Sequence, residues 1–214
     1  MTEHICLGEI CRPGGFKITD RALSFCRFPP GAHLADLGCG SGLTVEYLRR
    51  KYHLAAWGIE KDQVAAKSQG RDYVLVGNAM RLPFDQGELD GVLLECSLSK
   101  MEAPARVLKE CARVLKHRGY LIISDLYAQG KRGELSGLLG RVEDKETLFR
   151  ALTEQGFKVK LFEDYSQDLH AMWGQLIFRY GLKALCHNLG ADKETLQQIK
   201  CGYCLIVARK EASF

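Results

Sequence analysis

The chain has 214 residues, of which 46% are hydrophobic and 26% are charged. This length is enough for one well-buried core and short for two, and the composition excludes a disordered or low-complexity chain. The net charge of +4 arises from 30 basic and 26 acidic residues that are interspersed, which argues against a nucleic-acid-binding surface.

The first residues include acidic side chains and no apolar run, so the sequence predicts no signal peptide. No apolar stretch is long enough to span a bilayer. We therefore expect a cytoplasmic protein that acts without a membrane, and its nine cysteines should be reduced thiols.

Strands and helices alternate along most of the chain. Most of the expected strands are short apolar runs, while 157–162 alternates between apolar and polar residues, and several of the expected helices have apolar residues at intervals of three and four. The strands are expected at 33–36, 55–59, 73–76, 90–95, 120–124, 157–162 and 204–208, and the helices at 43–52, 62–69, 104–116, 143–155, 169–184 and 191–200. The alternation predicts an α/β fold in which helices cover both faces of a mainly parallel sheet.

The segment Asp36 to Gly42 reads DLGCGSG and lies between an expected strand and an expected helix. Glycine lets the backbone turn tightly and lets a ligand approach peptide groups. In open parallel sheets such a turn is the usual floor of a ligand site. The spacing is G-x-G-x-G, because the third glycine falls at Gly42, one residue too early for the dinucleotide-binding pattern.

Two further strand ends carry polar side chains. Glu60 ends the second expected strand, where a carboxylate can accept hydrogen bonds from both hydroxyls of a ribose. Asn78 follows the third, where its amide can pair with adenine while the N–H of the next residue meets a ring nitrogen. The order of glycine loop, carboxylate and amide predicts an adenosyl site.

These motifs resemble the class I, seven-stranded S-adenosylmethionine-dependent methyltransferases of the small-molecule type. The resemblance implies a Rossmann-like three-layer sandwich with a mostly parallel seven-stranded sheet, an antiparallel last strand and a helical insertion before that strand. It is carried by DLGCGSG, by GIE at 58–60, by GNAMRLPF at 77–84, by LKECARVLKHRGYLIISD at 108–125 and by GYCLIVARK at 202–210.

The resemblance also implies S-adenosyl-L-methionine as the cofactor and assigns residues to it. By this likeness the glycine loop faces the methionine part, Glu60 the ribose and the segment 78–80 the adenine. Asn78 stands where the family more commonly has aspartate. The cofactor-binding residues expected on this basis are Asp36, Gly38, Cys39, Gly40, Gly42, Glu60, Asn78, Ala79, Met80 and Glu95.

The implied activity is methyl transfer to a small-molecule acceptor by in-line displacement. A sulfonium methyl is already activated, so positioning and exclusion of water can suffice without a dedicated base. Two alternatives remain: a protein that binds the cofactor without catalysis, and a nicotinamide-dependent oxidoreductase, which the early Gly42 disfavours.

Candidate acceptor-side residues follow the fourth and fifth strands. They are Cys96, next to Ser97, and Asp125 and Tyr127. The stretch 95–127 resembles that of arsenite methyltransferases, which have a cysteine at the position of Cys96; this implies a thiol ligand for a soft acceptor. The simpler interpretation, a small buried residue beside the pocket, is favoured.

The remaining cysteines do not predict a metal site. Cys201 and Cys204 form one C-x-x-C pair, whereas four residues separate Cys6 from Cys11. A structural zinc needs two close pairs of cysteines.

We expect one methyltransferase domain over 1–214. Its parts are an N-terminal arm at 1–31, a cofactor-binding core at 32–164, a helical insertion or lid at 165–200 and a closing strand at 201–214. By resemblance, Gly14 and Gly15 in the arm offer N–H groups to the cofactor carboxylate; the alternative is a loop in which Thr19 or Asp20 caps a helix.

Overall fold

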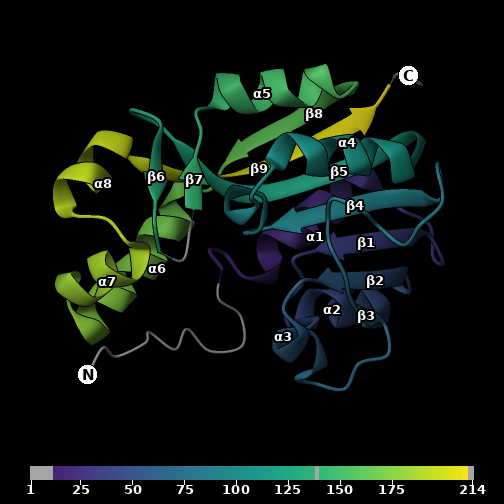
Figure 1. The fold of residues 1–214 in the computed structure, drawn as a ribbon, viewed down its shortest axis with the longest axis horizontal. Helices are drawn as coiled ribbons and strands as arrows, with labels where there is room; N and C mark the ends of the chain where they lie inside the picture. Colours follow the sequence, from purple (N-terminus) through teal and green to yellow (C-terminus); the bar gives the residue numbers. More distant parts are fainter. Residues whose placement is uncertain (1–11, 138–139, 212–214) are drawn as a thin grey trace.

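A seven-stranded sheet forms the centre of the protein, and Figure 1 shows the helices arranged around it. The structure is a computed structural model that describes residues 12–137 and 140–211. The strands of the sheet are β1 His33–Leu37, β2 Ala55–Glu60, β3 Val74–Val76, β4 Leu89–Glu95, β5 Leu115–Ala128, β8 Phe157–Asp164 and β9 Cys201–Lys210. Their order in the sheet is β3-β2-β1-β4-β5-β9-β8.

The helices connect these strands, and a short hairpin lies outside the main sheet. The hairpin consists of β6 Gly133–Leu135 and β7 Gly140–Val142. The helices are α1 Phe16–Cys26, α2 Leu43–Tyr52, α3 Gln63–Lys67, the 3₁₀ helix η1 Leu98–Lys100, α4 Pro104–Val114, α5 Lys145–Glu154, α6 Ser166–Tyr180, α7 Leu182–Leu189 and α8 Lys193–Ile199.

The direction of the chain across the sheet reverses beside β1. From β1 the chain moves outward to β2 and β3 and then returns to β4 on the other side of β1, and all of these neighbours pair in parallel. Leu34 pairs with Ala56 on one side and with Gly91 on the other. Ligands bind beyond the carboxyl ends of strands at such a reversal, so the fold positions a site at the ends of β1, β2 and β4.

The last strand, β9, runs antiparallel to both of its neighbours, β5 and β8. Helices α6, α7 and α8 lie between β8 and β9 in the chain. The expected fold class is therefore confirmed, including the antiparallel last strand and the helical insertion before it.

The core has one apolar layer on each face of the sheet. Ile18 of α1, Val45 of α2 and Leu169 of α6 are buried against one face. Cys111 of α4 and Leu152 of α5 are buried against the other. Burying a large aliphatic side chain contributes about 1.5–3 kcal/mol, so both layers hold the strand ends in place.

The structure corrects the expected end of one helix. The apolar pattern predicts a helix through Lys116, but α4 ends at Val114 and β5 begins at Leu115. Leu115 pairs with Leu89 of β4 ahead of a register shift in the two strands. Strand pairing over a long sequence separation outweighs the local helical pattern here.

The structure contradicts one of the two alternatives for the N-terminal segment, the loop with a capping side chain. Thr19 and Asp20 lie inside α1, and Gly15 is its N-cap, so neither side chain caps a helix there. Elsewhere the expected cap is present: the carboxylate of Asp62 accepts the N–H of Val64 at 2.8 Å at the start of α3.

The described cysteines are free thiols, and no group of three or more possible metal ligands occurs in the ranges that the structure covers. Cys201 and Cys204 are buried in the layers on opposite faces of the sheet. Cys6 and Cys11 lie outside the described residues. Within these same limits, no helix is both long enough and apolar enough to cross a membrane.

Candidate active site

The glycine loop between β1 and α2 brings the backbone against the end of β4. Gly38 has φ +74°, in the left-handed region, and a Cβ atom there would lie 2.8 Å from Cβ of Ser97. Its N–H donates to the carbonyl oxygen of Ile59 at 2.8 Å. Only glycine meets both conditions without strain, so this loop forms a main-chain floor beside the strand ends.

Glu60 at the end of β2 is held by the backbone. Its carboxylate accepts the N–H of Gly40 at 2.9 Å and the N–H of Asp62 at 2.9 Å. These hydrogen bonds fix the side chain beside the glycine loop. Carboxylate oxygens have further lone pairs, so Glu60 can also accept hydrogen bonds from two neighbouring hydroxyls.

Asn78 follows β3 and is fixed in the same way. Its Oδ1 accepts the N–H of Met80 at 2.9 Å. The amide nitrogen keeps its two donors, and Oδ1 keeps a second lone pair. Asn78 therefore offers both a donor and an acceptor, which suits the edge of a purine.

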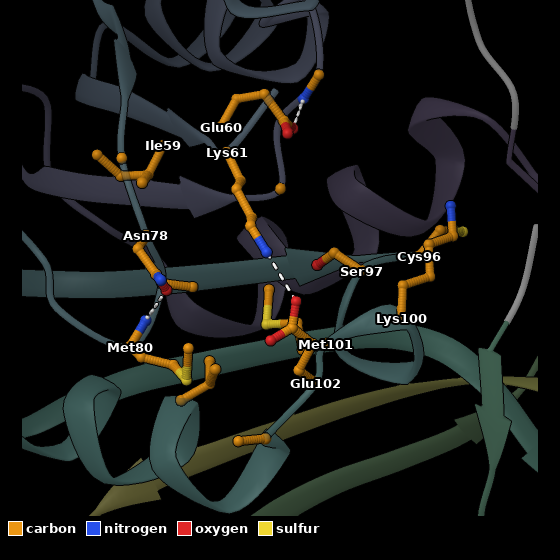
Figure 2. Close-up of a pocket in the computed structure, with 16 residues that line it drawn as sticks. Ile59, Glu60, Lys61, Asn78, Met80, Cys96, Ser97, Lys100, Met101 and Glu102 are labelled. Carbon is orange, nitrogen blue, oxygen red and sulfur yellow. Dashed lines mark hydrogen bonds and ion pairs between the residues drawn. The ribbon is translucent and has the colours of Figure 1, made fainter. Parts of the chain in front are cut away.

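These groups surround one cavity of about 400 Å³, shown in Figure 2. This volume lies in the usual range for small-molecule sites. Lys61 and Glu102 form an ion pair of 2.7 Å across it. The lining residues are Gly38, Gly40, Ile59, Glu60, Lys61, Gly77, Asn78, Ala79, Met80, Cys96, Ser97, Lys100, Met101, Glu102, Ala103 and Val107.

The cavity brings together six of the expected cofactor residues, namely Gly38, Gly40, Glu60, Asn78, Ala79 and Met80. The four others, Asp36, Cys39, Gly42 and Glu95, are not among its lining residues. Gly42 is the N-cap of α2, and Cys39 packs with the apolar layer on one face of the sheet. These assignments stay predictions.

Glu95 is bound by the N-terminal segment. Its carboxylate pairs with the guanidinium of Arg12 and accepts a hydrogen bond from the hydroxyl of Thr19 at 2.8 Å. The side chains of Arg12 and Glu95 are 11% and 3% exposed. Glu95 therefore anchors α1 and the residues before it to the end of β4.

Asp36 lies beneath the glycine loop and is only 3% exposed. Burial, together with the negative charges of Glu95 and Glu60, raises the pKa of Asp36 to about 8, while the charge of Arg12 opposes the shift. The carboxyl group is thus neutral over much of the range in which surface carboxylates are ionised.

Cys96 is a lining residue of the cavity and has φ +52°. Its Sγ lies 3.0 Å from the hydroxyl oxygen of Tyr203, and this hydroxyl donates to the carbonyl oxygen of Ser124 at 3.0 Å. A carbonyl oxygen only accepts, so the proton between Cys96 and Tyr203 belongs to the thiol. Burial raises the pKa of Cys96 to about 12, which also keeps it neutral.

The other two acceptor-side candidates do not line this cavity. Asp125 accepts hydrogen bonds from the N–H and the hydroxyl of Ser99, both at 2.9 Å, and borders a separate cavity of about 340 Å³. The hydroxyl of Tyr127 accepts a hydrogen bond from Nε2 of Gln129 at 2.9 Å. Cys96 is thus the acceptor-side candidate that the structure brings to the glycine loop.

One wall of the cavity is absent from the expected site. It comes from η1 and the start of α4 and includes Lys100, Met101, Ala103 and Val107. A three-residue 3₁₀ helix has no apolar period that a sequence pattern can reveal. Pro104 at the first turn of α4 is the one local signal near this wall.

Comparison with known proteins finds relatives that are named as methyltransferases. Residues 35–123 match the family model described as a methyltransferase domain. A sarcosine/dimethylglycine N-methyltransferase from Halorhodospira halochloris is 29% identical over 165 residues, covering 69% of this chain and 59% of the relative. An O-methyltransferase from Pyrenophora dematioidea is 25% identical over 218 residues, covering 91% and 80%.

The chain spans little more than half the length of some relatives. An uncharacterised protein from Haemophilus influenzae is 30% identical over 131 residues, which cover 56% of this chain and 52% of the relative.

Solved structures share the fold at lower identity. Geranyl diphosphate C-methyltransferase from Streptomyces coelicolor, in complex with S-adenosyl-L-homocysteine, superposes with a TM-score of 0.75 at 18% identity, covering 90% of this chain and 80% of that one. The [4+2]-cyclase SpnF superposes with a TM-score of 0.71 at 24% identity, covering 92% and 81%. Residues 35–123 therefore match a methyltransferase domain, and the chain shares its fold with solved methyltransferase structures.

Proposed function

We propose that the protein transfers a methyl group from S-adenosyl-L-methionine to a small-molecule acceptor by in-line displacement. The observation that carries the proposal is the convergence of three strand ends on one cavity. A main-chain floor at Gly38 and Gly40, the carboxylate of Glu60 and the amide of Asn78 all line it.

The residues present fit this cofactor. Glu60 would hold the ribose hydroxyls, Asn78 and the backbone at Met80 the adenine, and the glycine loop the methionine part. A Cβ atom at Gly40 would meet no atom within 4 Å, so the floor is open toward a ligand there. When bound, the cofactor supplies a methyl group that its positive sulfur has already activated.

The chain itself then has to orient the acceptor and exclude water. Met101, Ala103 and Val107 provide apolar wall opposite the glycine loop. Holding two reactants in line inside such a cavity can lower the barrier by about 7–11 kcal/mol. No proton-accepting side chain has to be assigned for this step.

The named relatives support small-molecule acceptors, because the matched proteins from Halorhodospira halochloris and Pyrenophora dematioidea are named as an N-methyltransferase and an O-methyltransferase. The mild and interspersed net charge of +4 favours a small acceptor over nucleic acid. We also propose that the protein is cytoplasmic and has no membrane partner. The free thiols of the described cysteines support a cytoplasmic location. We further propose that the chain is one domain in which residues 165–200 form a helical insertion or a lid.

A second candidate is a protein that binds the cofactor without methyl transfer. The similarity to a structure named as a [4+2]-cyclase favours keeping it, since one fold can host different reactions. Incubation with S-adenosylmethionine and a panel of thiols, amines and hydroxyls, followed by mass spectrometry of the products, distinguishes the two.

Calorimetry with S-adenosylmethionine and S-adenosylhomocysteine tests the proposal. We expect both to bind, and Glu60→Ala to lower affinity by about tenfold or more, because hydrogen bonds to a carboxylate contribute about 1.5–3 kcal/mol. Glu154→Ala, which removes an exposed carboxylate of α5 outside the cavity, is the matched control. Folded protein that binds neither compound would rule the proposal out, and a fluorescence titration with NADH would then test the oxidoreductase.

A further inference from the structure

The cavity has two halves of different chemistry, which Figure 2 shows on opposite sides. Glu60 and Asn78 lie at the ends of β2 and β3. Cys96, Ser97 and Lys100, here called the inner wall, lie at the end of β4 and in η1. With the nucleoside placed in the first half, as the proposed function requires, the inner wall is the surface left for the methyl acceptor.

Ser97 presents an unpartnered hydroxyl to this half. The residue is 6% exposed, and its Oγ has no hydrogen-bond partner among the described residues. The left-handed backbone of Cys96, with φ +52°, turns the chain sharply at the end of β4 just before Ser97. Buried polar groups in native structures are nearly always paired. A bound ligand would supply the hydrogen-bond partner that the Ser97 hydroxyl lacks.

Lys100 adds a positive charge to the inner wall, and Figure 2 shows its nitrogen near Cys96, on the side away from Glu60 and Asn78. In the part of the chain that the structure describes, its ammonium forms no ion pair. The two carboxylates that line the cavity are already engaged, Glu60 by backbone N–H groups and Glu102 by Lys61. A sulfonium bound here adds a second positive charge, so an anionic acceptor is attracted and a cationic amine is repelled.

The inner wall also offers no group to remove a proton. Its members are a thiol, a hydroxyl and an ammonium, and no histidine lines the described cavity. The thiol of Cys96 is hydrogen-bonded to the hydroxyl of Tyr203, and burial raises its pKa to about 12, so it stays neutral. An acceptor therefore has to arrive with its lone pair already free.

On the basis of the function proposed above, we propose that the inner wall selects a small acceptor whose nucleophilic atom is anionic, a thiolate or the ionised oxygen of an acidic hydroxyl. Lys100 is its counter-ion, and Ser97 donates a hydrogen bond that orients it. The acceptor releases its proton to solvent before it binds. Its lone pair then forms the new bond to the methyl carbon, and the electron pair of the broken carbon–sulfur bond returns to sulfur and neutralises the sulfonium.

Two ring-matched probes of opposite charge test this inference. Thiophenol is ionised to the thiolate at pH 8, whereas benzylamine is protonated. Methyl transfer to each is measured by mass spectrometry, and binding of each to the protein loaded with S-adenosylhomocysteine is measured by calorimetry. The variants are Lys100→Gln, Lys100→Arg and Ser97→Ala, and Lys109→Gln removes another exposed lysine that does not line the cavity.

We expect thiophenolate to be methylated, or at least bound, in preference to benzylamine. Lys100→Gln should lower its kcat/KM or its affinity by about tenfold, since hydrogen bonds to charged groups are among the stronger ones. Lys100→Arg should retain most of the preference, Ser97→Ala should show a smaller loss, and Lys109→Gln should behave as wild type.

Preference for benzylamine, absence of thiophenolate binding, or a Lys100→Gln variant with the wild-type preference would overturn the inference. S-adenosylhomocysteine affinity separates this result from failure of the proposed function. If that affinity is normal while the charge preference is absent, the inference alone fails. If neither the wild-type protein nor any of the variants binds S-adenosylhomocysteine, the proposed function fails.

Discussion

The two halves of the cavity are held together in different ways. Around Glu60 and Asn78 the polar side chains are fixed by backbone N–H groups, those of Asp62 and Met80 two residues away and that of Gly40 in the glycine loop. Around the end of β4 the fixing contacts join distant parts of the chain, as in the pair of Arg12 with Glu95. The first half is built from local motifs, and the second depends on tertiary packing. Substitutions in the two halves should therefore differ in their effects on stability and on cofactor binding.

The largest effect should come from breaking the distant contact. Arg12→Ala leaves the buried carboxylate of Glu95 without its cation, and removing one partner of a buried pair costs about 3–5 kcal/mol. Urea unfolding measures the change. Arg12→Lys keeps the charge and should cost less, and Lys17→Ala, which removes a largely exposed ion pair with Asp168, should change little. Equal stability of all three variants would show that the pair does not anchor the segment.

Breaking the local motif should affect both folding and cofactor binding. In Gly38→Ala, the left-handed backbone costs about 1–2 kcal/mol, and the contact with Ser97 adds about 1–3 kcal/mol of overpacking. We expect a lower unfolding midpoint and strongly weakened binding of S-adenosylhomocysteine by calorimetry. Gly31→Ala, at a positive φ but with no atom within 4 Å, controls for the backbone cost alone. If Gly38→Ala binds as wild type does, the close approach at the floor is unimportant.

A pH effect should arise where the two halves meet, at Asp36. Its pKa is raised from 3.8 to about 8, so between these values the folded state holds a proton that the unfolded chain has released. Stability should therefore fall as the pH rises from about 5 to 8, by at most about 1.4 kcal/mol per pH unit. Asp36→Asn should flatten this dependence in urea unfolding at several pH values. An identical slope in both proteins would contradict the assignment.

The smallest effect should come from the ion pair of Lys61 and Glu102 across the cavity. Both side chains are 72% exposed, so removing the pair should leave the unfolding free energy unchanged. Lys61→Ala should instead speed association of S-adenosylhomocysteine in stopped-flow experiments at low salt, because a bridge over the cavity is lost. The difference should disappear at high salt, where such pairs are screened. A change in stability would show that the pair does more than span the cavity.

The same contrast explains what the sequence could predict. Glu60 and Asn78 follow short strands at the expected order after the glycine loop, so the sequence alone indicates that they share an edge with Gly38. The alternation of apolar segments likewise predicts the fold class. These features depend on residues that are close together in the chain, and each carries its own local signal.

Other features depend on partners that no local pattern specifies. Glu95 pairs with Arg12, which lies 83 residues away in the chain, and no local pattern indicates this pair. Leu115 continues an apolar helical stripe, yet its pairing with Leu89 places it in β5. Lys100 lies in a helix of one turn without periodicity. In the first two cases a contact distant in sequence decides the structure, and in the third no local pattern marks the residue.

The hydrogen-bond chain from Cys96 through Tyr203 to Ser124 affects how the protein withstands its own reagent. A thiolate is the reactive form of cysteine, and the protonated form is a poor nucleophile. Because the Tyr203 hydroxyl donates its proton to a carbonyl oxygen, it accepts the proton of the thiol, and burial raises the pKa of Cys96 to about 12. This arrangement keeps the sulfur atom at the wall of the site in its protonated, poorly nucleophilic form, which protects it from an alkylating agent.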